Sequence, residues 1–196
     1  MKRSAELKRK TNETDVFVSV NLDGVGKYSI NTGIGFFDHM LETFSKQSLI
    51  DLKVNVNGDL KVDEHHTVED VGIVIGEVIN KALGKRIGVK RYGFVVPMDE
   101  SLAEVAIDLG GRRCVVFNCQ YSREMIGDMP TELIEDFFIA LAENLKASIH
   151  INVKYGRNDH HKAEAIFKAF GRALRMACED DSRINDIPST KGIIGK

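Results

Sequence analysis

The sequence predicts an α+β fold of two tandem, structurally similar half-domains, each a mostly antiparallel sheet with two helices, packed as an α/β sandwich. Repetition is the first observation behind this prediction: HHTVED begins at His65, and HHKAEA begins at His160. The segments ETDVFVSVNLDG and ESLAEVAIDLGG begin at Glu13 and Glu100, and Glu and Gly stand at the same spacing in both. A Phe-Phe doublet also opens a helix-like pattern in each half. Three echoes in the same order indicate an internal duplication.

The first half contains two periodicities. Apolar residues at every second position predict half-buried strands over 16–22 and 52–56. Apolar residues at helical spacing predict helices over 37–44 and 68–82. The first half therefore alternates strands and helices along the chain.

The second half repeats this order. Strand alternation recurs over 103–109 and 149–153, and helical spacing recurs over 133–145 and 163–177. Each half thus has strands, a helix, a further strand and a second helix. Two sheets with helices packed between or against them bury the apolar faces of all these elements.

The predicted halves span residues 1–90, with the HHTVED motif, and 91–196, with the HHKAEA motif. A loop around 84–93, rich in Gly, Lys and Arg, joins them. A chain of 196 residues accommodates one large domain or two small, closely packed ones. We expect the halves to form one compact catalytic unit.

Composition excludes several classes of protein. A net charge of -2 gives no electrostatic basis for binding nucleic acid or an anionic membrane. No apolar stretch is long enough to span a bilayer, and the basic start MKRSAELKRK leads into polar TNETD, unlike a secretory signal. Three cysteines without a CxxC pair favour a reducing, cytoplasmic compartment.

Four of the six histidines belong to two HHxxE motifs at the starts of predicted helices. His65 and Glu69 are four residues apart and share a helix face, whereas His66 points about 100° away. One helix can thus offer a His/Glu pair to one ion and a lone histidine to another. Two such helices and the remaining histidines supply four ligands for each of two ions. The candidate metal ligands are His39, His65, His66, Glu69, His150, His160, His161 and Glu164.

Imidazole and carboxylate without thiolate suit Mn, Fe, Ni, Co or Zn, and argue against a cysteine-rich structural zinc site. Surface or helix-capping histidines are the alternative interpretation, which the duplication disfavours for the HHxxE motifs. The residues alone leave open whether His39 and His150 are metal ligands. Ala140 stands where the repeat would place a second His39, and His150 lies on the polar side of a predicted strand.

The sequence resembles the imidazoleglycerol-phosphate dehydratase family over nearly its whole length. The similarity lies in KRKTNET, NLDGVGKYSINTGIGFFDHML, DEHHTVEDVGIVIGE, KRYGFVVPMDESLAEVAIDLGGR, NDHHKAEAIFKAFGRAL and IPSTKG. It departs from the family at Gln47, where many members carry another histidine. The chain also lacks the phosphatase domain that some members carry at the N-terminus.

The resemblance implies a hydro-lyase of histidine biosynthesis with two Mn²⁺ ions per active site, and includes His39 and His150 among the ligands. Imidazole glycerol phosphate would be converted to imidazole acetol phosphate and water. A metal-bound imidazolate would expel the neighbouring hydroxyl, giving a diazafulvene-like intermediate whose next C–H is acidified. A carboxylate must move the protons, and the resemblance assigns this catalytic role, against the substrate, to Glu13.

Phosphate recognition requires cations and hydroxyls. The resemblance implies substrate binding by Arg91, Arg112, Lys168, Ser189, Thr190 and Lys191. From the residues alone these side chains would be solvated surface groups. Arg113 adjoins Arg112, and the sequence does not decide between the two.

The resemblance also implies a homo-oligomer of 24 subunits built from trimers, with active sites at subunit interfaces. Two other functions stay open. A di-metal hydrolase of a phosphorylated small molecule would use similar ligands and release inorganic phosphate instead of a ketone. A non-catalytic metal-binding protein would need neither Glu13 nor a cationic phosphate pocket.

Overall fold

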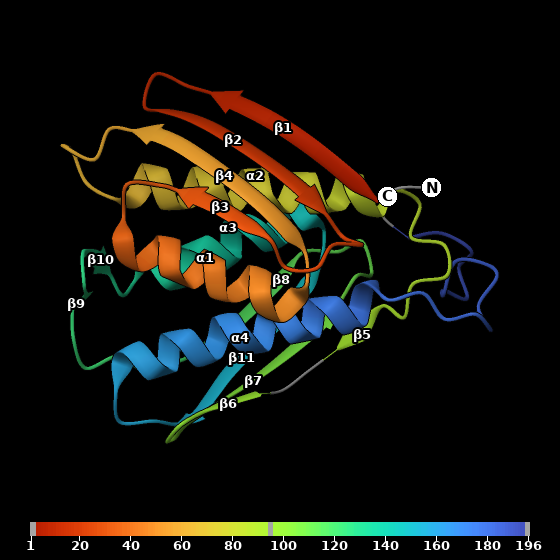
Figure 1. The fold of residues 1–196 in the computed structure, drawn as a ribbon. Helices are drawn as coiled ribbons and strands as arrows, with labels where there is room; N and C mark the ends of the chain where they lie inside the picture. The colour runs from red at the N-terminus through yellow and green to blue at the C-terminus, as the bar shows by residue number, and fades with distance from the viewer. Residues whose placement is uncertain (1–2, 94–95, 195–196) are drawn as a thin grey trace.

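A computed structural model describes residues 3–93 and 96–194, and within them four helices lie between two sheets (Figure 1). Apolar side chains from both sheets and all four helices form one hydrophobic core. This arrangement confirms the predicted sandwich of two similar halves. None of the described helices combines the length and hydrophobicity required to cross a membrane.

The first sheet has the strand order β1-β2-β4-β3. Its strands are β1 (Ser4–Lys10), β2 (Thr14–Asn21), β3 (Tyr28–Asn31) and β4 (Asp51–Gly58). The first three strands in this order pair antiparallel, and β3 runs parallel to β4. The alternating residues Val16, Val18 and Val20 of β2 are buried, as the period of two predicts. The predicted strand 52–56 is therefore confirmed, and the predicted strand 16–22 is confirmed except for its last residue, Leu22, which lies in the turn after β2.

The second sheet repeats this pattern in the order β5-β7-β11-β8, with β6 also paired to β7. Its strands are β5 (Tyr92–Gly93), β6 (Val96–Met98), β7 (Ser101–Asp108), β8 (Cys114–Asn118) and β11 (Ser148–Tyr155). Strands β7 and β11 are antiparallel, and β8 runs parallel to β11 as β3 does to β4. A small hairpin of β9 (Met125–Ile126) and β10 (Met129–Pro130) precedes the third helix.

All four predicted helices are present, three of them longer than predicted. They are α1 (Gly35–Ser48), α2 (His65–Leu83), α3 (Leu133–Leu145) and α4 (Asp159–Cys178). Helix α1 begins before its apolar pattern because Asp128, from the turn between β9 and β10, accepts hydrogen bonds from the backbone N–H groups of Gly35 and Phe36 (2.7 and 3.0 Å). A carboxylate at this position satisfies free N–H groups and complements the helix dipole.

The helices of the two halves pack crosswise. Helices α1 and α2 cover the first sheet, and α3 and α4 cover the second, but α1 packs on α4 and α2 packs on α3. Aromatic pairs lie at these contacts. Phe44 of α1 stacks on Phe170 of α4 with ring centroids 5.3 Å apart, and Phe37 of α1 meets Phe137 of α3 edge-on at 5.4 Å. The two halves consequently share their core. The division at residue 90 stays a prediction, within a loop that joins α2 to β5.

Two glycines at equivalent positions allow these helices to approach closely. Gly76 and Gly171 each stand eleven residues after the first histidine of their HHxxE motif. A Cβ atom at Gly76 would lie 2.5 Å from the carbonyl oxygen of Leu141 in α3. A Cβ at Gly171 would lie 2.9 Å from the carbonyl oxygen of Phe44 and 3.1 Å from the Cβ of Gln47 in α1. Glycine at these positions sets the distance between the helices.

A buried arginine fixes the loop between the halves. The guanidinium of Arg86, only 4% exposed, donates to the carbonyls of Leu109 (2.7 Å), Leu145 (2.5 Å) and Lys146 (3.2 Å) and to Asn80 Oδ1 (2.7 Å). It therefore satisfies carbonyls at the C-terminal end of α3, where a positive charge is favourable. One side chain thereby ties the connecting loop to α2, α3 and the end of β7.

We predict that Gly76→Ala and Gly171→Ala each lower the free energy of unfolding, by about 1–3 kcal/mol, because the added methyl meets backbone atoms of the facing helix. In an unhindered helix the same change would stabilise the protein by roughly 0.5–1 kcal/mol. Urea unfolding at one protein concentration measures the difference. Lys81→Ala, at an exposed position of α2, is the control and should change stability by less than about 0.5 kcal/mol. A gain in stability at Gly76 would contradict the close approach.

Candidate metal and phosphate sites

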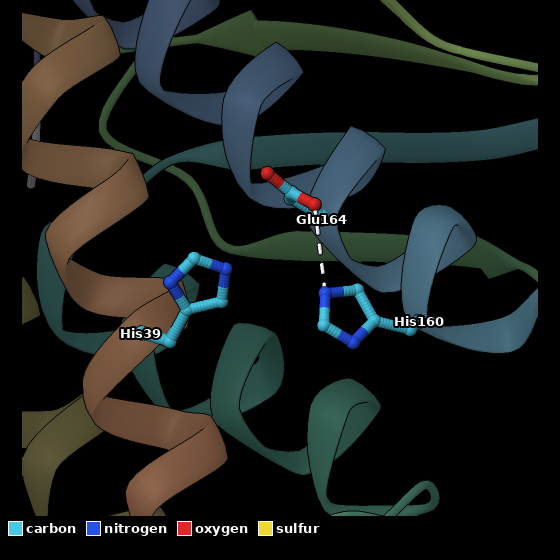
Figure 2. Close-up of side chains that lie close together, drawn as sticks. All are labelled: His39, His160 and Glu164. Carbon is cyan, nitrogen blue, oxygen red and sulfur yellow. Dashed lines mark ion pairs between the residues drawn. The ribbon is translucent and has the colours of Figure 1, made fainter.

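The contact between α1 and α4 brings three candidate ligands together, as Figure 2 shows for His39, His160 and Glu164. Each offers a ligand atom, and these atoms lie within 4.8 Å of one another. His160 Nε2 is 3.6 Å from Glu164 Oε2, one helical turn later, and the imidazole rings of His39 and His160 are 5.8 Å apart. Helix α4 starts at this point because the side chain of Asn158 accepts a hydrogen bond from the backbone N–H of His160 (3.0 Å).

The surroundings favour a ligand role for this cluster. Burial opposes ionisation of Glu164, but the ammonium of Lys168, 2.9 Å away, holds the pKa of this carboxyl below its ordinary value. The edge contact of Phe36 with the ring of His160, at 5.2 Å between centroids, limits how that imidazole can turn. Metal–ligand bonds of about 2.0–2.2 Å keep the donors around one ion within roughly 4–4.5 Å of each other. The spacing and the donor set therefore fit one Mn²⁺-type cation after small side-chain adjustments.

The corresponding residues of the first half lie on α2. His65 and Glu69 approach to 3.9 Å, and Asp136 of α3 is 3.9 Å from the other ring nitrogen of His65. They line a cavity of about 250 Å³ between α2 and α3. Ala140 lines it too, at the position that matches His39. His65 and Glu69 are therefore the counterparts of His160 and Glu164, but the facing helix supplies no second histidine at the position of Ala140.

The second histidine of each motif lies between carboxylates. His66 Nδ1 is 3.0 Å from Asp59 Oδ2, and its Nε2 is 3.7 Å from Glu13 Oε1. His161 Nδ1 is 2.7 Å from Glu100 Oε2. The hydrogen bond to Asp59, with a further contribution from Glu13, raises the pKa of His66, and the hydrogen bond with His161 lowers the pKa of Glu100 to about 2. The duplicated glutamates Glu13 and Glu100 thus both contact the second histidine of their own half.

His150 is exposed on the outer face of β11, between the buried residues Ile149 and Ile151. Its register partners are Ala106 of β7 and Val116 of β8. Within residues 3–93 and 96–194, it is not part of the cluster of His39, His160 and Glu164. The imidazole of His150 is therefore accessible from the outer surface of the second sheet, where any metal ion that it binds would lie.

Five of the seven predicted substrate-binding residues, all except Glu13 and Lys168, share one cavity of about 420 Å³ at the end of the second sheet. Arg91, Arg112, Ser189, Thr190 and Lys191 line it, together with Gly110, Pro188, Ile193 and Ile194. Lys168 lies elsewhere, beside Glu164 and the Met98 sulfur. Arg113 pairs with Glu143 of α3 and does not line the cavity, so the geometry favours Arg112 of the two neighbours.

The side chain of Arg91 is already held in place. Its Nε and Nη2 donate to the two oxygens of Asp108, the latter at 2.8 Å, and its Nη1 donates to the carbonyl of Pro188 (3.0 Å). The hydrogen bond to Asp108 raises the pKa of Arg91 further above its ordinary value. Arg91 therefore links β7 to the C-terminal segment that carries Ser189, Thr190 and Lys191.

The sequence did not reveal the acidic partners of His65, His66, Arg91 and His161. The structure adds Asp59, Asp108 and Asp136, and it gives a contact to Glu100, which the repeat had singled out without a role. The repeat spacing of Glu13 and Glu100 was the available signal for Glu100. The other three follow from pairings between distant segments, which spacing along the chain does not report.

Comparisons with known proteins identify the family of the chain. A family profile described as imidazoleglycerol-phosphate dehydratase matches residues 32–174. The imidazoleglycerol-phosphate dehydratase of Clostridium acetobutylicum is 58% identical over 194 residues, covering 98% of both chains, and that of Acetivibrio thermocellus is 53% identical over 99% of this chain and 100% of its own.

Two solved structures are also similar. The crystal structure of imidazoleglycerol-phosphate dehydratase from Staphylococcus aureus has a TM-score of 0.82 at 38% identity, covering 91% of this chain and 99% of its own. The Pyrococcus furiosus enzyme, crystallised in complex with (S)-C348, has a TM-score of 0.81 at 32% identity, covering 96% and 100%. The chain therefore belongs to the imidazoleglycerol-phosphate dehydratase family.

Proposed function

We propose that this chain is a metal-dependent hydro-lyase of histidine biosynthesis that converts imidazole glycerol phosphate to imidazole acetol phosphate and water in the cytoplasm. Membership of the family supports the reaction. The observation that carries the metal dependence is the group of His39, His160 and Glu164, which α1 and α4 bring together from opposite halves.

Two Mn²⁺ ions are the proposed cofactors. Within one chain, His39, His160 and Glu164 would hold one of them, and His65 and Glu69 would begin the second site. The lone histidines His66, His150 and His161 would complete the coordination. Bound Mn²⁺ would polarise the imidazole ring of the substrate as a Lewis acid.

Glu13 is the proposed proton-transfer group. Its carboxylate is exposed and 3.7 Å from His66 Nε2, so it faces the same space as a proposed ligand. Thr11 Oγ1 accepts hydrogen bonds from the backbone N–H groups of Glu13 and Thr14 (3.1 and 3.0 Å), and the Thr14 hydroxyl is bonded to Asp70 of α2. The backbone of Glu13 is therefore fixed to the metal-binding helix, while its carboxylate is free to accept a proton from the substrate carbon.

The phosphate of the substrate would bind in the cavity that Arg112, Ser189, Thr190 and Lys191 line with Arg91. Arg112 and Lys191 are exposed there, and within residues 3–93 and 96–194 no carboxylate pairs with their side-chain nitrogens. Their charges are thus available to a phosphate, whereas Arg91 is shared with Asp108. Lys168, beside Glu164, would act nearer the metal than the phosphate.

A second subunit is proposed to complete the active site. The part of the chain that the structure describes groups three ligands at one point, while His65, His66, His150 and His161 lie outside this group. The exposed side chains of His39, His65 and His150 are open to a neighbour. An assembly of 24 subunits built from trimers, as the sequence resemblance implies, would bring such half-sites together at its interfaces.

His65→Ala or His160→Ala should each abolish turnover and reduce bound metal, because each removes one imidazole and leaves its glutamate partner alone. Metal analysis of the purified protein and a dehydration assay that detects the ketone in alkali measure the two effects. Arg172→Ala, at an exposed position on α4, is the control and should retain both. Two metals per chain with a normal rate in either histidine variant would contradict the proposal.

Glu13→Gln should reduce kcat by roughly 10²–10⁴ with little change in metal content or substrate affinity, because the amide cannot take up a proton. Steady-state kinetics together with metal analysis separate these quantities. Glu6→Gln, an exposed glutamate on β1, provides the matched control. Loss of metal in Glu13→Gln would instead make Glu13 a ligand or a structural residue.

Chelator, or a pH well below the ordinary histidine pKa of about 6.5, should shift the assembly toward trimers, because protonated imidazole cannot bind a metal. An ion held across an interface stabilises the assembled form by mass action, so Mn²⁺ at neutral pH should restore it. Size-exclusion chromatography with light scattering follows both steps. An assembly indifferent to EDTA and Mn²⁺ would show that metals do not bridge subunits.

A further inference from the structure

The second histidines of the two HHxxE motifs make the same kind of hydrogen bond, but their partners come from different positions of the repeat. In each, Nδ1 is hydrogen-bonded to a carboxylate: His66 to Asp59 at 3.0 and 3.2 Å, and His161 to Glu100 at 2.7 Å. The two carboxylates are not equivalent in the repeat. Asp59 directly follows β4, whereas Glu100 directly precedes β7, and the repeat equivalent of Glu100 is Glu13.

The two ring nitrogens of a neutral imidazole have different roles: one carries the proton and the other carries the lone pair. An ionised carboxylate only accepts hydrogen bonds, so it fixes the proton on the nitrogen that it contacts. With Nδ1–H donating to Asp59 or Glu100, the lone pair belongs to Nε2 in both histidines. Nε2 of His66 is 3.7 Å from Glu13, and Nε2 of His161 is 3.9 Å from Asp99, both beyond hydrogen-bond distance.

We infer that Asp59 and Glu100 are positioning residues that hold His66 and His161 in the Nδ1–H tautomer and direct Nε2 toward a metal ion. The inference rests on the proposed metal-dependent function. Carboxylates behind ligating histidines fix the ring orientation and raise the basicity of the ligand nitrogen, and their loss reduces metal affinity by about 10–100-fold.

The two carboxylates are held differently, and this difference makes the inference testable. The two oxygens of Glu100 have different partners. Oε1 accepts hydrogen bonds from the backbone N–H groups of Asn158 (2.9 Å) and Arg157 (3.3 Å), and Oε2 faces His161. Both oxygens of Asp59 approach the same nitrogen of His66. Amide substitution should therefore have opposite consequences at the two positions.

In Glu100→Gln the single oxygen remains on the two backbone N–H groups, which places the NH₂ group against His161 Nδ1. That NH₂ group donates, so His161 must accept at Nδ1 and carry its proton on Nε2, where it cannot bind a metal. In Asp59→Asn the amide can turn its oxygen toward His66 and preserve the Nδ1–H tautomer, whereas Asp59→Leu cannot.

Two measurements on the full chain test this reasoning. Equilibrium dialysis gives the dissociation constants for Mn²⁺, and ¹⁵N magic-angle-spinning NMR of histidine-labelled, metal-free protein gives the tautomer of each ring. Only six histidines contribute signals, and the variants His66→Gln and His161→Gln assign the signals of these two rings. Glu104→Gln, on β7 four residues after Glu100 and paired with Lys154, is the matched control.

We expect Glu100→Gln and Asp59→Leu to weaken Mn²⁺ binding by about 10–100-fold. Asp59→Asn and Glu104→Gln should bind close to the wild type. In the metal-free protein the His161 signal should change to the Nε2–H tautomer in Glu100→Gln alone.

An unchanged His161 tautomer in Glu100→Gln would overturn the inference, as would unchanged Mn²⁺ affinity in both Glu100→Gln and Asp59→Leu. Failure of the wild type to bind Mn²⁺ would contradict the proposed function instead. In that case the tautomers of the metal-free variants still decide whether Asp59 and Glu100 position the rings.

Discussion

Packing of α1 from the first half against α4 from the second half is the contact on which the candidate site depends. His39 lies on one of these helices, and His160 and Glu164 lie on the other. Their donor atoms lie within 4.8 Å of one another across this contact, and the two helices also approach closely at Gly171, eleven residues after His160. The duplication places the same requirement on α2 and α3, where Gly76 has the same role. The proposed metal site therefore depends on how the core helices pack.

The histidines lie in a markedly acidic environment. Glu13, Asp59 and Glu100 surround the second histidines of the motifs, and Glu69 and Asp136 flank His65. A divalent cation bound at these histidines would be attracted by the neighbouring carboxylates. The cavity proposed to bind phosphate is separate and is lined by the cations Arg91, Arg112 and Lys191. This division of charge supports the proposed substrate, whose ring would meet metal ions while its phosphate meets cations.

Much of the fold follows from the sequence because its periodicity reflects burial. The strand 16–22 and the helix 133–145 follow directly from residues whose alternate or helical positions are buried. Strands β1 and β8 could not be predicted in this way because neither alternates clearly: β1 is mostly polar, and β8 is a short apolar run without a polar face. The start of α1 could not be predicted because its cap, Asp128, comes from a distant hairpin. The repeat singled out the HHxxE residues as candidate ligands, but the grouping of His39 with His160 required three-dimensional packing.

Crosswise packing of the helices has a consequence for the origin of the chain. A half-length ancestor would have had to place its first helix on the second helix of another copy, and would have existed as a symmetric pair with two identical contacts. Fusion of the copies freed these contacts to diverge. His39 now faces His160 in one contact, whereas Ala140 lines the cavity beside His65 in the other. The modern chain thus retains the symmetry of its ancestor in the backbone and in the HHxxE motifs, but not in the residue that the facing helix contributes.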